Sequence, residues 1–169
     1  MGEAIVNKIC QETNTQIANI NCPGQLVISG SKDNLTQAAN LAKSSGAYRT
    51  IELQVSGAFH TPLMQPAVVG MTNIVDTLTF NEPMFPIIAN TTAQPLTTSE
   101  QLKAELLRQL CHNIRWQQSV EYMIDNSIST FIEIGPGRIL SGLNKRINRN
   151  VKTINISDAK ALEEFLSTD

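Results

Sequence analysis

Segments with helical spacing of apolar residues alternate with strand-like segments along this chain, and this alternation restricts its fold more than any other feature. In the first third, Ile5, Ile9 and Cys10 share one face of a predicted helix. A hairpin signal follows at residues 22–24 (Cys-Pro-Gly), and Ser31 and Gly46 are suited to begin and end a second helix. The predicted order is helix, strand, strand, helix and strand, over residues 3–13, 16–21, 25–29, 31–45 and 48–55.

The rest of the chain continues the alternation with more helices than strands. Helices are predicted over residues 62–78, 99–110, 116–126 and 138–148, and strands over 86–89, 130–134 and 151–156. This pattern favours parallel strands with helices on both faces of a sheet. No internal repeat and no low-complexity linker interrupts it. The sequence therefore predicts an α/β fold.

The composition argues against two classes of partner. The net charge is −2 and aromatic residues make up 5% of the chain, whereas a nucleic-acid interface needs a basic face with stacking aromatic side chains. No apolar run approaches the ~20 residues that span a bilayer, and no signal peptide precedes the first predicted helix. We therefore expect a cytoplasmic protein with neither nucleic-acid nor membrane partners.

Metal sites and disulfides are also not expected. Cys10, Cys22 and Cys111 are odd in number and lack CxxC spacing, which is typical of reduced thiols. His60 and His112 are the only histidines, and no carboxylate cluster joins them. The charged fraction of 17% is low for a free-standing domain. Either part of the surface normally packs against further polypeptide, or Asn, Thr, Ser and Gln supply the polar surface; composition favours neither.

His60 is the candidate catalytic residue. It lies in a loop after the predicted strand 48–55 and just before a helix that Thr61 can cap and Pro62 can begin. A histidine on a loop between two rigid elements is well placed to act as a general base. From position alone, a solvated or structural histidine remains the commoner alternative.

Residues 57–64 (Gly-Ala-Phe-His-Thr-Pro-Leu-Met) resemble the active-site histidine segment of malonyl-CoA:acyl carrier protein transacylases. Three further segments agree in the same order, so the resemblance extends from about residue 3 to about residue 157. They are Asn-Ile-Asn-Cys-Pro-Gly-Gln at 19–25, Arg-Gln-Leu at 108–110 with Trp116 and Ser-Val-Glu-Tyr at 119–122, and Phe-Ile-Glu-Ile-Gly-Pro-Gly at 131–137 with Leu-Ser-Gly-Leu at 140–143.

Two of the family's functional positions have no counterpart. The family's nucleophile is a serine in a Gly-His-Ser-x-Gly turn, and this sequence contains no Gly-x-Ser-x-Gly. The arginine that binds the substrate carboxylate also has no matching position. The resemblance thus implies the C-terminal part of the enzyme, which begins inside the smaller subdomain. It implies a partial ferredoxin-like subdomain at residues 1–55, without its first strand, and the C-terminal part of an α/β-hydrolase-like acyltransferase subdomain at 56–169.

The resemblance assigns the catalytic roles. His60 would activate the serine of the missing N-terminal part, and a backbone carbonyl at the position of Gln109 would hold the second ring nitrogen of the imidazole. The Gln109 side chain need not take part; without the resemblance, it is a polar residue on an amphipathic helix. Residues 111–113 (Cys-His-Asn) depart from the family's usual aromatic-Asn-Pro run, which puts the local geometry in doubt, and His112 receives no catalytic role.

Four residues are candidate substrate contacts. The family places a bulky aromatic before the histidine when it accepts malonyl groups, which matches Phe59; the alternative is plain core packing. Asn19, Asn21 and Gln25 match positions that line the channel for the acyl and pantetheine groups, and amide side chains suit pantetheine's own amides. Ordinary turn-forming Asn is the alternative. The Gly-Pro-Gly at 135–137 lacks the GK[ST] ending of a phosphate loop and is read as a strand-to-helix turn.

The resemblance implies transfer of a malonyl group from coenzyme A to acyl carrier protein through an acyl-serine, in fatty-acid synthesis. No cofactor is implied, and the isolated chain is expected to be nearly inactive. Two alternatives stay open. The chain could be a non-catalytic module that binds carrier protein or a separate nucleophile-bearing half, or a piece of a polyketide synthase acyltransferase domain. The basic residues Arg138, Lys145 and Arg146 could meet an acidic carrier protein, although a solvated helix face is favoured.

Overall fold

The computed structural model describes residues 1–167, which form a mixed α/β fold, as predicted. The chain forms two compact units, Met1–Ser119 and a second that begins at Val120. Its strands make three two-stranded sheets among the described residues. Within residues 1–167, no helix has the length and apolar character that crossing a membrane requires.

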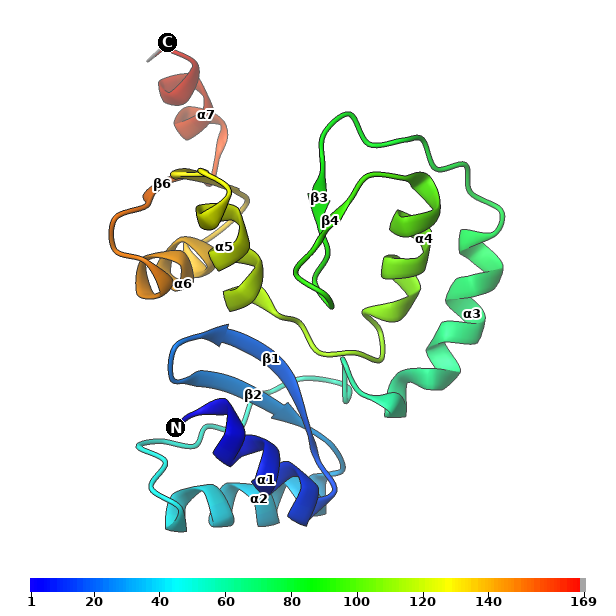
Figure 1. The fold of residues 1–169 in the computed structure, drawn as a ribbon, viewed down its shortest axis with the longest axis vertical. Helices are drawn as coiled ribbons and strands as arrows, with labels where there is room; N and C mark the ends of the chain where they lie inside the picture. The colour runs from blue at the N-terminus through cyan, green and yellow to red at the C-terminus, as the bar shows by residue number, and fades with distance from the viewer. Residues whose placement is uncertain (168–169) are drawn as a thin grey trace. The chain divides into compact units, whose positions relative to one another are not determined.

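The first part of this unit contains a hairpin and two helices that pack together (Figure 1). Its elements are α1 (Glu3–Thr13), β1 (Gln16–Cys22), β2 (Gln25–Ser29) and α2 (Lys32–Ser44), and the predictions for all four are confirmed. The hairpin turns at Gly24, whose φ of +78° is accessible to glycine without strain. Ser31 accepts a hydrogen bond from the backbone N–H of Asn34 and so caps α2, as predicted.

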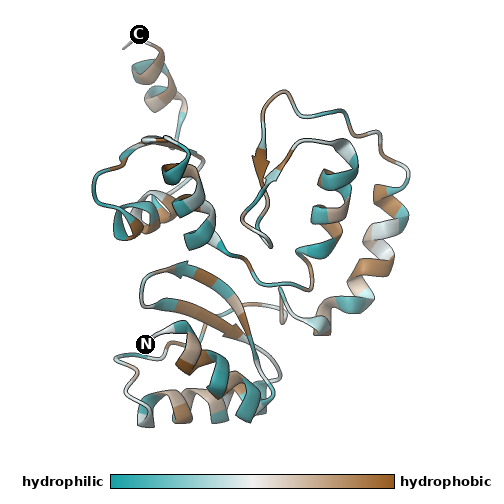
Figure 2. Ribbon diagram, in the orientation of Figure 1, coloured by the Kyte–Doolittle hydropathy of each residue, from teal (hydrophilic) through white to brown (hydrophobic). Residues whose placement is uncertain are grey.

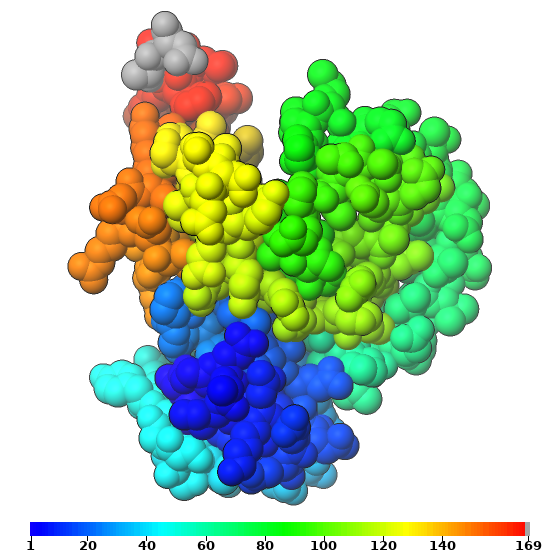
Figure 3. Space-filling view, viewed as in Figure 1, coloured from blue at the N-terminus to red at the C-terminus, as the bar shows by residue number. Residues whose placement is uncertain are grey.

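Apolar side chains hold the hairpin to α1. Cys10, Ile17 and Ile20 form the buried cluster, and Val6, Leu26 and Ile28 pack against it. Figure 2 shows the apolar residues running along both strands of the hairpin. The space-filling view shows the N-terminal helix α1, coloured blue, open to solvent on one side (Figure 3). The predicted face of α1 is correct for Ile9 and Cys10, whereas Ile5 is 48% exposed.

The strand predicted over residues 48–55 is wrong. These residues adopt no regular structure, and Tyr48, Ile51, Leu53 and Val55 are all exposed. A strand forms only where another strand satisfies its backbone N–H and C=O groups. Within residues 1–167 no strand pairs with this segment, so its strand-like composition has no sheet to join.

The remainder of the first unit carries two helices and a short hairpin. The elements are η1 (Pro62–Met64), α3 (Gln65–Val75), β3 (Ile87–Ile88), β4 (Pro95–Leu96) and α4 (Ser99–Arg108). Only β4, two residues long and beginning with proline, was not predicted. Thr98 and Gln101 form a capping box at the start of α4. Beyond α4, Ile114 exchanges backbone hydrogen bonds of 2.8 Å with Ala18 and Ile20 of β1, which fastens this segment to the first hairpin.

Helix α5 (Trp116–Asp125) begins in the first unit and ends in the second. The second unit contains β5 (Thr130–Ile134), α6 (Ile139–Ile147), β6 (Lys152–Ile156) and α7 (Ala159–Leu166). β5 and β6 pair in parallel, with Ile132 opposite Ile154, and this confirms the predicted parallel pairing. Helices α6 and α7 both contact β6.

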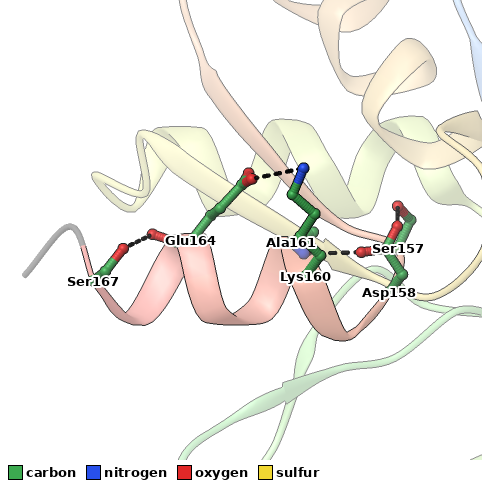
Figure 4. Close-up of polar contacts among 6 residues, drawn as sticks. All are labelled: Ser157, Asp158, Lys160, Ala161, Glu164 and Ser167. Carbon is green, nitrogen blue, oxygen red and sulfur yellow. Dashed lines mark hydrogen bonds and ion pairs between the residues drawn. The ribbon is translucent and has the colours of Figure 1, made fainter.

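Helix α7 was not predicted, although its capping signal is present in the sequence. Asp158 accepts a hydrogen bond of 2.8 Å from the backbone N–H of Ala161, which caps the helix (Figure 4). Lys160 and Glu164, one turn apart on this helix, form an exposed ion pair at 3.7 Å. An Asp followed by a helix-period segment is a start signal that would have identified α7.

Candidate active site

The loop before η1 places His60 in an uncommon backbone conformation. His60 has a φ of +63°, in the left-handed region that residues other than glycine adopt only at a cost in free energy. The neighbouring Thr61 is only 2% exposed. Its hydroxyl donates to the carbonyl of Ala58 at 2.7 Å and accepts from the backbone N–H of Leu63, so the predicted cap is present. Buried hydrogen bonds thus hold the residue that follows His60.

Two hydrogen bonds connect His60 to the end of α4. Its backbone N–H donates to the carbonyl of Leu110 at 3.1 Å. Its ring Nδ1 lies 2.7 Å from the carbonyl oxygen of Gln109. Because a carbonyl only accepts, the ring nitrogen in this contact carries the proton, and the neutral ring then has its lone pair on Nε2. The imidazole in this state can accept a proton through Nε2.

The structure adds residues around Gln109 that the sequence did not single out. Asn90 donates from Nδ2 to Oε1 of Gln109 at 3.0 Å. Thr91 donates from its backbone and its hydroxyl to the carboxylate of Glu105, at 2.8 and 2.7 Å. Asn90 and Thr91 follow β3, and nothing in their sequence context distinguishes them from other turn residues. The contacts depend on the tertiary fold, so local patterns could not predict them.

Phe59 is not part of a packed core in this chain. Its side chain is 44% exposed. The ring lies over Gly57, where an added Cβ would be 3.3 Å from the ring edge. The glycine therefore lets the ring lie close to the backbone. The role of Phe59 in substrate choice stays a prediction.

Asn19, Asn21 and Gln25 lie on the β1–β2 hairpin and are half-buried. Asn19 lies opposite Val27 of β2, and Asn21 lies at an irregularity in the register between Ile20 and Cys22. Gln25 accepts a weak hydrogen bond from the thiol of Cys22 at 3.8 Å. Among residues 1–167, the hydrogen bonds of His60 do not reach Asn19 or Asn21. The structure thus brings together His60 and Gln109, and the binding role of the hairpin residues stays a prediction.

His112 lies close to the site but has a structural contact of its own. Its Nδ1 is 2.9 Å from the carbonyl of Arg108, and the side chain is exposed. The neighbouring Cys111 donates its backbone N–H to the same carbonyl at 3.1 Å, which continues the turn at the end of α4. The departure from the family's run at 111–113 therefore leaves the carbonyl of Gln109 directed at His60.

The turn at 135–137 joins β5 to α6, and the first amides of α6 are already occupied. Glu133 accepts from the backbone N–H groups of Leu140 and Ser141 at 3.0 and 2.8 Å. Hydrogen bonding by Ser141 and by the backbone of Leu140 lowers the pKa of the Glu133 carboxyl. A carboxylate at this helix terminus takes the place that a phosphate would need.

Neither described cavity involves the histidine. A groove of about 490 Å³ lies between α1 and α2, and a pocket of about 210 Å³ lies beside the turn of the first hairpin. Within residues 1–167, no three His, Cys, Asp or Glu side chains are arranged to hold a metal ion. Cys10, Cys22 and Cys111 form no disulfide with one another in the structure. Burial raises the pKa of the Cys10 thiol, while a hydrogen bond with Thr15 acts in the opposite direction.

One of the candidate basic residues on α6 is engaged within the second unit. Lys145 donates through Nζ to the carbonyl of Val151 and also approaches that of Arg149. These contacts fasten the end of α6 to the turn that leads into β6. Lys145 therefore has a structural role, which weakens the case for a carrier-protein site on this helix.

Comparison with known proteins relates the chain to one family. It is 41% identical over 165 residues to a malonyl CoA-acyl carrier protein transacylase of Bacillus subtilis, and this match covers 97% of the chain and 52% of the relative. The protein of the same name from Staphylococcus aureus is 36% identical over 169 residues, covering 97% of the chain and 55% of the relative. No protein-family model matches the chain.

Solved structures agree with the sequence comparison. The acyl-carrier-protein S-malonyltransferase of Bartonella henselae superposes with a TM-score of 0.94 at 35% identity, covering 99% of this chain and 55% of that one. A malonyl-transacylase solved in complex with its type II PKS acyl-carrier protein gives 0.94 at 31% identity, covering 100% and 56%. The chain spans about half the length of the relatives it matches. The resemblance is therefore confirmed: nearly the whole chain is similar to malonyl CoA-acyl carrier protein transacylases, and it spans about half of their length.

Proposed function

We propose that this chain is the histidine-bearing part of a malonyl-CoA:acyl carrier protein transacylase. The observation that carries the proposal is the contact of 2.7 Å between Nδ1 of His60 and the carbonyl of Gln109. It supports an imidazole with a fixed tautomer and an available Nε2, which a general base in acyl transfer requires. The similarity to named transacylases over 97% of the chain supports the substrate class.

The proposed reaction has two steps. Nε2 of His60 takes the proton of a serine hydroxyl supplied by a segment that this sequence does not contain. The serine oxygen attacks the thioester carbon of malonyl-CoA, the C–S bond breaks, and coenzyme A leaves as the thiol with the proton from the imidazolium. In the second step, His60 takes the proton of the phosphopantetheine thiol, and the thiolate attacks the carbonyl carbon of the acyl-serine ester. The ester C–O bond breaks, and the imidazolium returns the proton to the serine oxygen. Each half-reaction leaves His60 neutral.

The proposal extends to the subdomains and the substrate contacts. Residues 1–55 would be a ferredoxin-like subdomain without its first strand, which the order of α1, β1, β2 and α2 supports. Residues 56–169 would be part of the larger α/β-hydrolase-like subdomain. The compact units of this chain divide elsewhere, because Ile114 pairs with β1 and so joins the two regions. Phe59, Asn19, Asn21 and Gln25 would contact the acyl and pantetheine groups. A cytoplasmic location and the absence of a cofactor complete the proposal.

A reconstitution experiment tests this function. The chain is mixed with the part of the Bacillus subtilis relative that it does not match, and malonyl transfer to acyl carrier protein is measured. We expect transfer from the mixture and almost none from either piece alone. A stable complex without transfer would instead favour a non-catalytic binding module. Transfer by this chain alone, at the rate of the intact relative, would contradict the assignment of roles.

A further inference from the structure

The turn after β3 is fastened to one face of α4 by three side-chain hydrogen bonds. Asn90 bonds the side chain of Gln109, and Thr91 bonds both oxygens of Glu105. Glu105 and Gln109 are four residues apart, so they lie on the same face of the helix. Thr91 is 5% exposed, which protects its two bonds from competition with water. We call these four residues the α4 clamp.

Asn90 also holds the other end of the segment that follows α4. Its backbone carbonyl accepts from the N–H of Arg115 at 2.7 Å. The connection from residue 109 to residue 115 is thus bonded to Asn90 at both of its ends. The carbonyls of Gln109 and Leu110, which bond the ring and the backbone of His60, both lie in this connection.

We propose that the α4 clamp positions His60, with Asn90 and Gln109 acting as positioning residues through their side chains. The last carbonyls of a helix have no partner within the helix, and the final turn frays readily unless other contacts hold it. The clamp supplies those contacts, and the Gln109 carbonyl then selects the tautomer of His60 with its proton on Nδ1. This inference rests on the proposed function in one respect, because positioning affects catalysis only if His60 is the base.

The ring nitrogens of His60 provide a readout that needs no transfer assay. In the ¹⁵N-labelled chain, two-bond ¹H–¹⁵N correlations above the imidazole pKa should show His60 protonated at Nδ1. We expect Asn90→Leu and Gln109→Leu, each of which removes one partner of the bond, to give a mixture of tautomers for His60. Gln109→Glu keeps an acceptor for Asn90 and should retain the wild-type pattern. His112 serves as the internal reference, since it is the only other histidine.

Gln101→Ala is the matched control, because it removes the capping box at the opposite end of the same helix. It should lower stability without changing the His60 tautomer. Unchanged His60 signals in a folded Asn90→Leu or Gln109→Leu chain would overturn the proposal. If Asn90→Leu does not fold, Gln109→Leu decides the question alone. The wild type and Gln109→Leu both keep the backbone carbonyl of residue 109 and differ only in its side chain. A tautomer change after Gln101→Ala as large as that in the clamp variants would also overturn it.

Kinetics of the reconstituted enzyme separate this inference from the proposed function. The clamp variants should lower kcat roughly 10-fold to 100-fold, as small displacements of catalytic groups do, with the KM for malonyl-CoA within about twofold. If the clamp variants change the His60 tautomer but replacing His60 does not lower the rate of malonyl transfer, only the proposed function is contradicted. Transfer that depends on His60 but is insensitive to the clamp would contradict the positioning role alone.

Discussion

The backbone of His60 is held in a left-handed conformation by hydrogen bonds on both of its sides. Its own N–H bonds Leu110, and the hydroxyl of Thr61 bonds Ala58. A strained residue persists only where its surroundings determine its conformation, and such residues cluster at functional sites. The strain predicts an unusual order of stability among variants. The free energy of unfolding of His60→Gly should be about 1 kcal/mol higher than that of His60→Ala, because glycine adopts positive φ without strain.

Urea denaturation of the two variants checks this order. Both remove the imidazole, so the comparison isolates the backbone conformation from the loss of the contact with Gln109. A matched pair at Gln65, which has a φ of −51°, should show the opposite order, with alanine more stable than glycine. Equal stabilities at position 60 would show that its conformation is not strained in solution.

The exposed ring of Phe59 predicts an effect on substrate choice. In the reconstituted enzyme, Phe59→Ser should raise the kcat/KM ratio of methylmalonyl-CoA to malonyl-CoA, since a smaller side chain leaves space for the additional methyl group. One methyl group is worth ~1–3 kcal/mol in an apolar pocket, so a change of roughly 10-fold or more is expected. Competition between the two thioesters measures the ratio directly. A ratio equal to that of the wild type would assign Phe59 to packing alone.

Individual residues of the site differ in how far the sequence could identify them. The resemblance gave His60 and the carbonyl of Gln109 directly, since both belong to contiguous motifs. Asn90 was not identified, because its bond to Gln109 spans nineteen residues of sequence and exists only in the folded chain. Phe59 had packing as an alternative reading, and a local motif could not distinguish a substrate contact from a packing residue.

At the level of single elements, Glu133 connects the end of β5 to the start of α6. Its carboxylate accepts backbone hydrogen bonds from Ser141 and Leu140 in the first turn of the helix, and hydrogen bonding by Ser141 is the main cause of its lowered pKa. A carboxyl with a lowered pKa in the folded state stabilises the protein above its ordinary pKa and loses this contribution as pH falls through the folded value. Solvent screens this partly exposed carboxylate, so Glu133→Gln should cost roughly 0.5–1 kcal/mol near neutral pH.

The cost of Glu133→Gln should disappear in acid, where both side chains are neutral. Urea denaturation of wild type and variant across a pH series downward from 7 measures the difference. Glu164→Gln provides the control, because its ion pair with Lys160 is solvent-exposed and should contribute less than about 0.5 kcal/mol. A difference for Glu133→Gln that stayed constant as the pH fell would show that its charge does not stabilise α6.

The elements that the sequence predicted correctly carry their own signals. Helices α2 and α4 have side-chain caps, α1 has amphipathic spacing, and the first hairpin has a glycine at its turn. Residues 48–55 have the composition of a strand but lack a partner among the described residues, and composition cannot report on pairing. The two-residue strand β4 is too short for a period-2 pattern to be detected.

Over the whole molecule, large apolar side chains are exposed in both units. Met84 and Phe85 are 97% and 72% exposed in the first unit, and Ile134 and Ile139 are 80% and 76% exposed in the second. Each described sheet has two strands, which is marginal for independent stability. These features are expected of a chain that spans about half of its relatives. They favour the first of the two explanations for the low charged fraction, that part of the surface packs against further polypeptide.

This exposure predicts a change on reconstitution. Adding the unmatched part of the Bacillus subtilis relative should raise the unfolding temperature of this chain and lower its binding of the dye ANS, because exposed apolar surface becomes buried. The control is the matched part of the same relative, added in place of the unmatched part. Because it corresponds to this chain, it competes for the same partner. No change in either quantity would indicate that the exposed residues do not form an interface with that part.

The proposed function makes His60 the general base of malonyl transfer. The most direct test is the rate of serine acylation by malonyl-CoA in a single turnover of the reconstituted enzyme, comparing wild type with His60→Ala. Removing the general base that activates a catalytic serine lowers the rate on the order of 10³-fold or more. We therefore predict that His60→Ala lowers the acylation rate by that factor while the complex still forms. An acylation rate within about threefold of the wild type would contradict the account.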